Sequence, residues 1–277
     1  MVNRRSRQKD ATMGKRKRAK RETTERNQRE KHFLMTMTGE PYQLARIHYE
    51  VFNRSRIARV FSRLKCMDYD PDQKRWVWLY DGEAKKLQFN WPYSSVPAEK
   101  HPIVLGSFFS RSEDEMFLSV NSFDRATKAI VFFERYFRKM LILKALAKVT
   151  DIEVVNKYFG PSAGGEFPRH EDYFERQPVA KTDPEVFMNK LESMVSSAKD
   201  KEERSKLAFA YLEESAKQPT PEIERLPTNF CEDGIEGLEA NLRMRQAIAY
   251  QHWLGNTGYT HYDLVQDMLH RPPEAVH

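Results

Sequence analysis

The sequence predicts an α+β protein in which an antiparallel four-stranded sheet is packed by helices and is followed by an all-α C-terminal half. Three observations predict it: two pairs of strand-like segments between residues 65 and 120, a periodic helix directly after them, and only helical periodicity beyond residue 183. The 277 residues suffice to bury a sizeable core.

Composition divides the chain into four parts. Residues 1–31 have no apolar periodicity and are expected to form a disordered basic tail, and residues 32–160 form the α+β domain. Residues 161–182 contain Gly-Gly, three prolines and mixed charges, which is typical of a linker or exposed loop. Residues 183–277 form the helical domain.

The first expected element lies between residues 42 and 64. Apolar residues recur there near helical spacing, and the polar stretch 53–56 interrupts them. This pattern predicts one bent helix or two short ones.

Two hairpins follow. Residues 65–80 place an aromatic and β-branched run after the turn-rich segment 71–73, and residues 102–120 contain two apolar runs around the polar turn 111–114. Together they predict four antiparallel strands.

The clearest helix covers residues 123–137, where aromatic and aliphatic residues step by three and four along one face. Asn121 and Asp124 can cap its start. Thr150 and Glu153 form a capping-box pattern that predicts a short second helix, ended by Gly160.

The C-terminal half shows only helical patterns. Asp183 is a capping residue followed by proline at the first helical position. Periodic apolar residues predict helices over about 184–198, 201–217, 235–253 and 261–270, with a proline-punctuated connection before the third.

Charge is concentrated at the N-terminus. Residues 1–31 hold thirteen Lys and Arg against four Asp and Glu, a local charge of +9, whereas the remaining residues carry 33 basic and 36 acidic side chains. Such a run indicates phosphate contact, nuclear import if the source is eukaryotic, or a solubilising extension. The candidate nucleic-acid-binding residues in it are Arg4, Arg5, Lys15, Arg16, Lys17, Arg18, Lys20 and Arg21.

One predicted strand has a wholly aromatic face. Trp76, Trp78 and Tyr80 alternate with apolar residues, and a base-stacking platform needs such a face. We therefore add Trp76 and Trp78 to the candidate nucleic-acid-binding residues. The alternative is a strand buried on both faces.

A short motif suggests a third function. Pro71-Asp72 followed by Glu83-Ala84-Lys85 resembles the Pro-Asp…Glu-x-Lys signature of a large nuclease superfamily. The resemblance covers about fifteen residues and implies two acids that hold a divalent metal and a lysine that assists the attacking water.

We predict no cofactor and no metal site, because the familiar nucleotide, hydrolase and zincin motifs do not occur. Cys231, His252, His261 and His270 also lack the close spacing of structural zinc ligands.

The expected compartment is the cytoplasm, or the nucleus of a eukaryote. Two cysteines provide no disulfide framework, and no apolar run is long enough to span a membrane.

We therefore expect a non-catalytic nucleic-acid-associated protein that contacts RNA or DNA through its basic tail. The alternative is a protein-interaction or assembly module that docks a partner through its helical half. A metal-dependent nuclease that uses Asp72, Glu83 and Lys85 is the third possibility.

Overall fold

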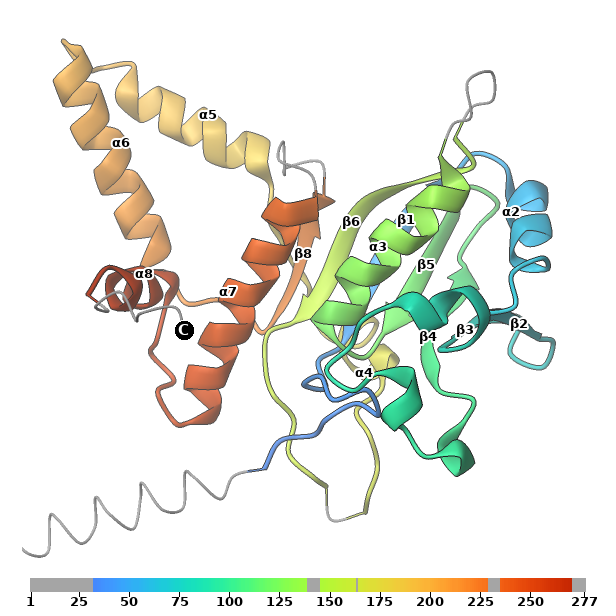
Figure 1. Ribbon diagram of the computed structural model, residues 1–277. Coiled ribbons are helices and arrows are strands. Elements are labelled where there is room, and N and C mark those ends of the chain that lie inside the picture. The colour runs from blue at the N-terminus through green and yellow to red at the C-terminus, as the bar shows by residue number, and fades with distance from the viewer. Residues whose placement is uncertain (1–31, 139–144, 163, 229–234, 271–277) are drawn as a thin grey trace, which may run out of the picture.

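The computed structural model describes residues 32–138, 145–162, 164–228 and 235–270. Its centre is one eight-stranded sheet with the strand order β2-β3-β4-β5-β1-β6-β8-β7 (Figure 1). All neighbours are antiparallel except β7 and β8. The strands are β1 (Ala45–Val51), β2 (Met67–Asp70), β3 (Arg75–Leu79), β4 (Val104–Ser110), β5 (Glu115–Val120), β6 (Ala147–Val155), β7 (Ala180–Lys181) and β8 (Ile223–Pro227).

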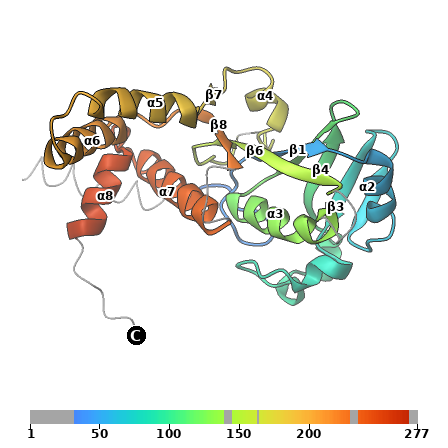
Figure 2. The same cartoon turned by 90° about the horizontal axis from the view of Figure 1, so that it is seen from above.

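Helices lie on both faces of this sheet. Helix α3 and part of α7 cover one face, α4 lies on the other, and α5 and α6 project beyond the sheet (Figures 1 and 2). The helices are α2 (Arg54–Phe61), α3 (Phe123–Phe137), α4 (His170–Phe174), α5 (Pro184–Val195), α6 (Lys201–Ala216), α7 (Ile235–Trp253) and α8 (His261–His270), with 3-10 turns η1 (Gly82–Lys86), η2 (Tyr93–Ser95) and η3 (Ala98–Lys100).

The predicted four-stranded sheet with an all-α C-terminal half is wrong. The sheet is mixed and has eight strands, and two of them, β7 and β8, come from the segment after residue 160. Leu238 and Leu242 of α7 belong to the same core as Phe133 of α3. Both halves of the chain therefore contribute to one sheet and one core.

The two predicted hairpins are confirmed as the pairs β2–β3 and β4–β5. The helix predicted over 123–137 is confirmed as α3, although its cap is Ser122, whose hydroxyl accepts a hydrogen bond from the backbone N–H of Arg125. The predicted C-terminal helices correspond to α5 to α8.

The helix predicted from residue 42 is wrong in its first half, where the chain forms β1. Ile47, Tyr49 and Val51 alternate with polar residues, so the segment also has the period of a strand. Pairing with β5 and β6 on both sides decides the outcome, because tertiary contacts override a weak local preference. Only α2 remains helical.

The helix predicted from the capping box at Thr150 is also wrong, because Thr150 and Glu153 lie inside β6. The acids on β6 are satisfied across the sheet: Arg225 of β8 donates to Asp151 at 2.9 Å, and Glu153 lies 3.1 Å from the imidazole Nε2 of His48. The predicted linker and proline-rich connection contain α4, β7 and β8.

A buried ion pair joins the segment before β1 to α3. The guanidinium of Arg125 donates to Glu40 at 3.1 Å and to Thr38 at 2.8 Å, and both charged side chains are almost fully buried. Burial opposes ionisation of Glu40, but Arg125 and the threonine hydroxyls hold the pKa of its carboxyl below the ordinary value. Within the described ranges, no helix is both long and apolar enough to cross a bilayer.

Candidate functional site: an aromatic pocket at the end of the sheet

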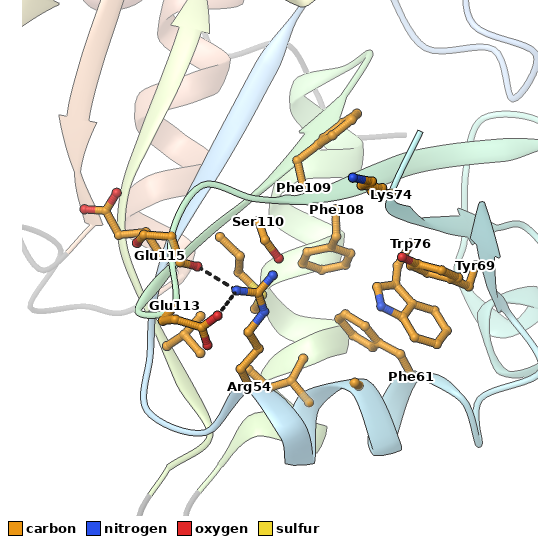
Figure 3. A pocket seen from close by; sticks show the side chains of 15 residues that line it. Arg54, Phe61, Tyr69, Lys74, Trp76, Phe108, Phe109, Ser110, Glu113 and Glu115 are labelled. Atoms are coloured by element: carbon orange, nitrogen blue, oxygen red, sulfur yellow. Dashed lines mark hydrogen bonds and ion pairs between the residues drawn. The ribbon is translucent and has the colours of Figure 1, made fainter. Parts of the chain in front are cut away.

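A pocket of about 440 Å³ lies where α2 meets the β2–β3 hairpin and the β4–β5 turn (Figure 3). Its volume is in the range of small-ligand sites. The lining residues are Val51, Arg54, Ile57, Ala58, Phe61, Tyr69, Lys74, Trp76, Phe108, Phe109, Ser110, Ser112, Glu113, Glu115 and Met116.

Two aromatic rings on neighbouring strands form one wall. Tyr69 of β2 pairs in register with Trp76 of β3, and their ring centroids are 5.0 Å apart. Cross-strand partners have adjacent side chains on one face of the sheet, so the pairing itself brings these rings together. Tyr69 is 47% exposed and Trp76 is partly exposed, which leaves ring surface for a ligand.

The floor is apolar. Phe61 of α2 packs against Phe108 of β4 with ring centroids 4.8 Å apart, and it also contacts Trp76 at 5.5 Å. Both phenylalanines are almost fully buried. The core therefore fixes the floor, whereas the wall is free on its outer side.

A tight turn holds the hairpin that carries the wall. The carboxylate of Asp70 accepts the backbone N–H groups of Asp72 and Gln73 at 3.1 Å, and it also accepts the Nε–H of Arg75 at 3.1 Å. The Gln73 N–H and Arg75 hold the pKa of Asp70 below its ordinary value.

Lys74 follows this turn with a φ of 50°, a left-handed conformation that few residues other than glycine adopt. It lines the pocket and forms no ion pair with any residue in the described ranges. Short β-hairpin loops often contain a residue in this conformation, so it belongs to the turn; Lys74 is a candidate contact to a ligand anion because it lines the pocket.

The opposite rim carries a paired charge. Arg54 donates to the carbonyl of Ser112 at 3.2 Å and to the carboxylate of Glu113 at 2.9 Å (Figure 3). Glu115 also lines this rim. The pocket thus combines a partly exposed aromatic wall, a lysine that has no ion pair among the described residues, and acceptors for N–H groups. Such a set of groups can stack on a planar ring and contact an anion.

Trp76 and Trp78 differ in how far they are buried. Trp78 is fully buried, with its ring 5.2 Å from Phe133 and 5.7 Å from Phe132 of α3. It cannot stack on a base in this structure, so we do not retain it in the site. Trp76 lies two residues nearer the β2–β3 turn on the same strand, where its ring packs on Phe61 of α2 and stays partly exposed.

The residues of the nuclease-like motif are not gathered. Asp72 lies in the β2–β3 turn and Glu83 in η1, at opposite ends of β3, and a strand of five residues spans about 16 Å. The Glu83 carboxylate accepts the backbone N–H of Cys66, and Lys85 pairs with Asp81 at 2.7 Å. Across the described part of the chain, no group of three or more His, Cys, Asp or Glu could hold a metal ion.

The basic residues between Arg4 and Arg21 lie outside the described residues, as does Cys231. The sequence interpretation missed Tyr69, Lys74, Arg54 and Phe61. Pairing the hairpin about the predicted turn 71–73 would have placed Tyr69 opposite Arg75; the loop is one residue longer, so Tyr69 lies opposite Trp76. The contribution of α2 depends on tertiary packing.

Comparison with known proteins provides no relative: no protein-family model, no curated protein and no solved structure matches the chain.

Proposed function

We propose that the protein is a non-catalytic, single-strand nucleic-acid-binding protein. The observation that carries this proposal is the register pair Tyr69–Trp76, a partly exposed aromatic wall in a pocket large enough for a base. Lys74 lies beside it and has no ion pair within the part of the chain that the structure describes. Each base stacked on an aromatic side chain contributes about 1–3 kcal/mol, so one occupied pocket supplies modest affinity.

The basic N-terminal segment supplies the rest in this proposal. Its local charge of +9 contrasts with the slight acidity of the remaining chain. Counterion release from phosphates would then provide most of the binding free energy and make it depend on salt, while the pocket would favour unpaired bases over a duplex. The compartment that fits this function is the cytoplasm, or the nucleus of a eukaryote.

The test is fluorescence anisotropy of the full chain with labelled single-stranded RNA, single-stranded DNA and duplex DNA across a salt series. Trp76→Leu should weaken single-strand binding about tenfold and leave duplex binding unchanged. Lys74→Gln should lower the salt slope by about one. Deletion of residues 1–31 should flatten most of that slope.

Trp91→Leu is the matched control, because Trp91 is 52% exposed but does not line the pocket. An equal loss in Trp91→Leu and Trp76→Leu would contradict a role of the pocket. If neither the full chain nor the truncated chain binds any of the three probes at low salt, the proposed function is wrong.

A second candidate function is protein interaction through the helical half. The observation that favours it is the exposure of large apolar side chains on α5 and α6: Val186 is 63% exposed and Phe209 is 73% exposed. Large apolar patches on a surface indicate contact sites.

A further inference from the structure

Helix α6 has an unusual distribution of apolar residues. Its centre is a run of six, Leu207 to Leu212, with the sequence LAFAYL, between charged ends. Six consecutive residues cover every side of an α-helix, and a helix that is apolar on all sides is normally buried. Yet no residue of α6 is buried in this structure.

Helix α5 covers only one side of this run. Phe187 of α5 packs on Tyr211 with ring centroids 5.1 Å apart, and Lys190 lies over the same ring at 5.6 Å. On the other side, Phe209 is 73% exposed and Leu212 is 45% exposed. Figures 1 and 2 agree that α5 and α6 project away from the sheet, so the body of the molecule does not cover this side.

The charges at the ends of the run indicate what fits there. Residues 203–206 contain Glu203, Arg204 and Lys206, a net charge of +1, whereas residues 213–216 contain Glu213 and Glu214, a net charge of −2. The midpoint between these two turns falls between Phe209 and Ala210. When two copies of α6 lie antiparallel about this midpoint, the positive end of each therefore faces the negative end of the other.

We propose that the uncovered side of α6 binds a second copy of this chain, with the two α6 helices antiparallel and the twofold axis near Phe209. This deepens the second function proposed above and rests on it. In that arrangement the apolar runs bury one another, and Lys206 of each copy lies near Glu213 of the other. A twofold contact uses the same patch on both copies, as a self-complementary surface requires.

The size of the contact sets the expected affinity. A helix of 16 residues is about 24 Å long. One face of such a helix buries less area than the roughly 800 Å² per partner of a stable interface. Val186 and Met188 of α5 are also exposed and would extend the contact into a four-helix arrangement. We therefore expect a dimer that dissociates in the micromolar range.

Sedimentation velocity of the full chain over about 1–200 μM tests the proposal. The wild type should shift from the monomer to the dimer mass across this range, and Phe209→Glu should raise the dissociation constant about tenfold or more. Leu269→Glu is the matched control, because Leu269 is also 73% exposed but lies on α8. Unchanged circular dichroism of both variants shows that each remains folded.

Charge reversal separates a second copy from any other partner. Lys206→Glu and Glu213→Lys should each weaken the dimer, and the double variant should restore it, because only self-pairing reunites the exchanged charges. A wild type that stays monomeric at every concentration overturns the proposal, as does a double variant weaker than both single variants. Nucleic-acid binding is measured separately by anisotropy and is expected to survive Phe209→Glu, because Phe209 does not line the pocket. A failure of the dimer is therefore distinguishable from a failure of the first proposed function.

Discussion

His170 is a residue whose protonation the fold opposes. Its imidazole Nε2 lies 2.9 Å from the carbonyl oxygen of Val120, and because a carbonyl only accepts, Nε2 carries the proton that is donated. Burial lowers the pKa of His170 from its ordinary 6.5 to about 4. The side chain is therefore neutral at physiological pH, and it helps to hold α4 on the sheet.

This shift predicts a pH dependence of stability. Between pH 6.5 and 4 the unfolded chain binds the proton and the folded protein does not, so the free energy of unfolding should fall as the pH drops through this window and level off below it. The loss is at most about 3 kcal/mol. His170→Gln should flatten this part of the profile in urea unfolding from pH 4 to 7; parallel wild-type and variant profiles would contradict it.

The two tryptophans of β3 show what a single sequence can decide about the site. Alternation correctly places Trp76 and Trp78 on one face of the strand, but it cannot say where a covering helix ends. Phe132 and Phe133 of α3 pack on Trp78 and bury it, whereas Trp76 packs on Phe61 of α2 and stays partly exposed. The pocket was thus predictable only in part: the strand pattern gives Trp76, whereas Tyr69 depends on the exact register of the hairpin and the floor depends on α2.

The turn after β3 depends on one glycine. Gly82 has a φ of 47°, and a Cβ atom at this position would lie 2.6 Å from the Cβ of Lys65 and 3.0 Å from the backbone nitrogen of Cys66. Neither atom is the end of a flexible side chain. The close approach lets η1 pack against the start of β2, where Glu83 accepts the N–H of Cys66.

Gly82→Ala should therefore lower the free energy of unfolding by about 1–3 kcal/mol, through both the left-handed backbone and the steric overlap. Gly258→Ala is the matched control, since a Cβ there would meet no atom within 4 Å. Urea unfolding of the two variants measures the difference. Equal midpoints would show that the turn relaxes without cost.

The elements that local patterns failed to predict are those whose pairing partners lie far away in the chain. β6 carries a capping-box pattern and β8 contains a proline, yet the two pair antiparallel across some seventy residues. Pro227 is tolerated because it ends its strand and β7 pairs with β8 only at Glu224 and Arg225, so β7 needs no N–H from it. In contrast, the β2–β3 and β4–β5 hairpins and α3 are specified by neighbouring residues, and the sequence predicts all of them.

At the scale of the whole molecule, the sheet joins the two halves of the chain. β6 lies between β1 of the first half and β8 of the second, and the smaller of the two cores combines Tyr42 and Leu44 with Phe174 and Ile223. A domain boundary predicted near residue 160 would cut through both the sheet and this core. The division into domains at that point is open to a direct test.

A fragment of residues 32–160 should fail to fold cooperatively, whereas residues 32–277 should unfold in a single transition. The fragment lacks β8, so the backbone N–H and C=O groups along that edge of β6 lose their hydrogen-bond partners. The carboxylates of Asp151 and Glu153 also lose their ion pairs with Arg225. It also exposes core side chains that Leu238 and Leu242 of α7 cover. Circular dichroism and urea unfolding of both chains measure this. A fragment that unfolds cooperatively at the midpoint of the longer chain would establish residues 32–160 as an independent domain, with β8 and α7 as additions to it.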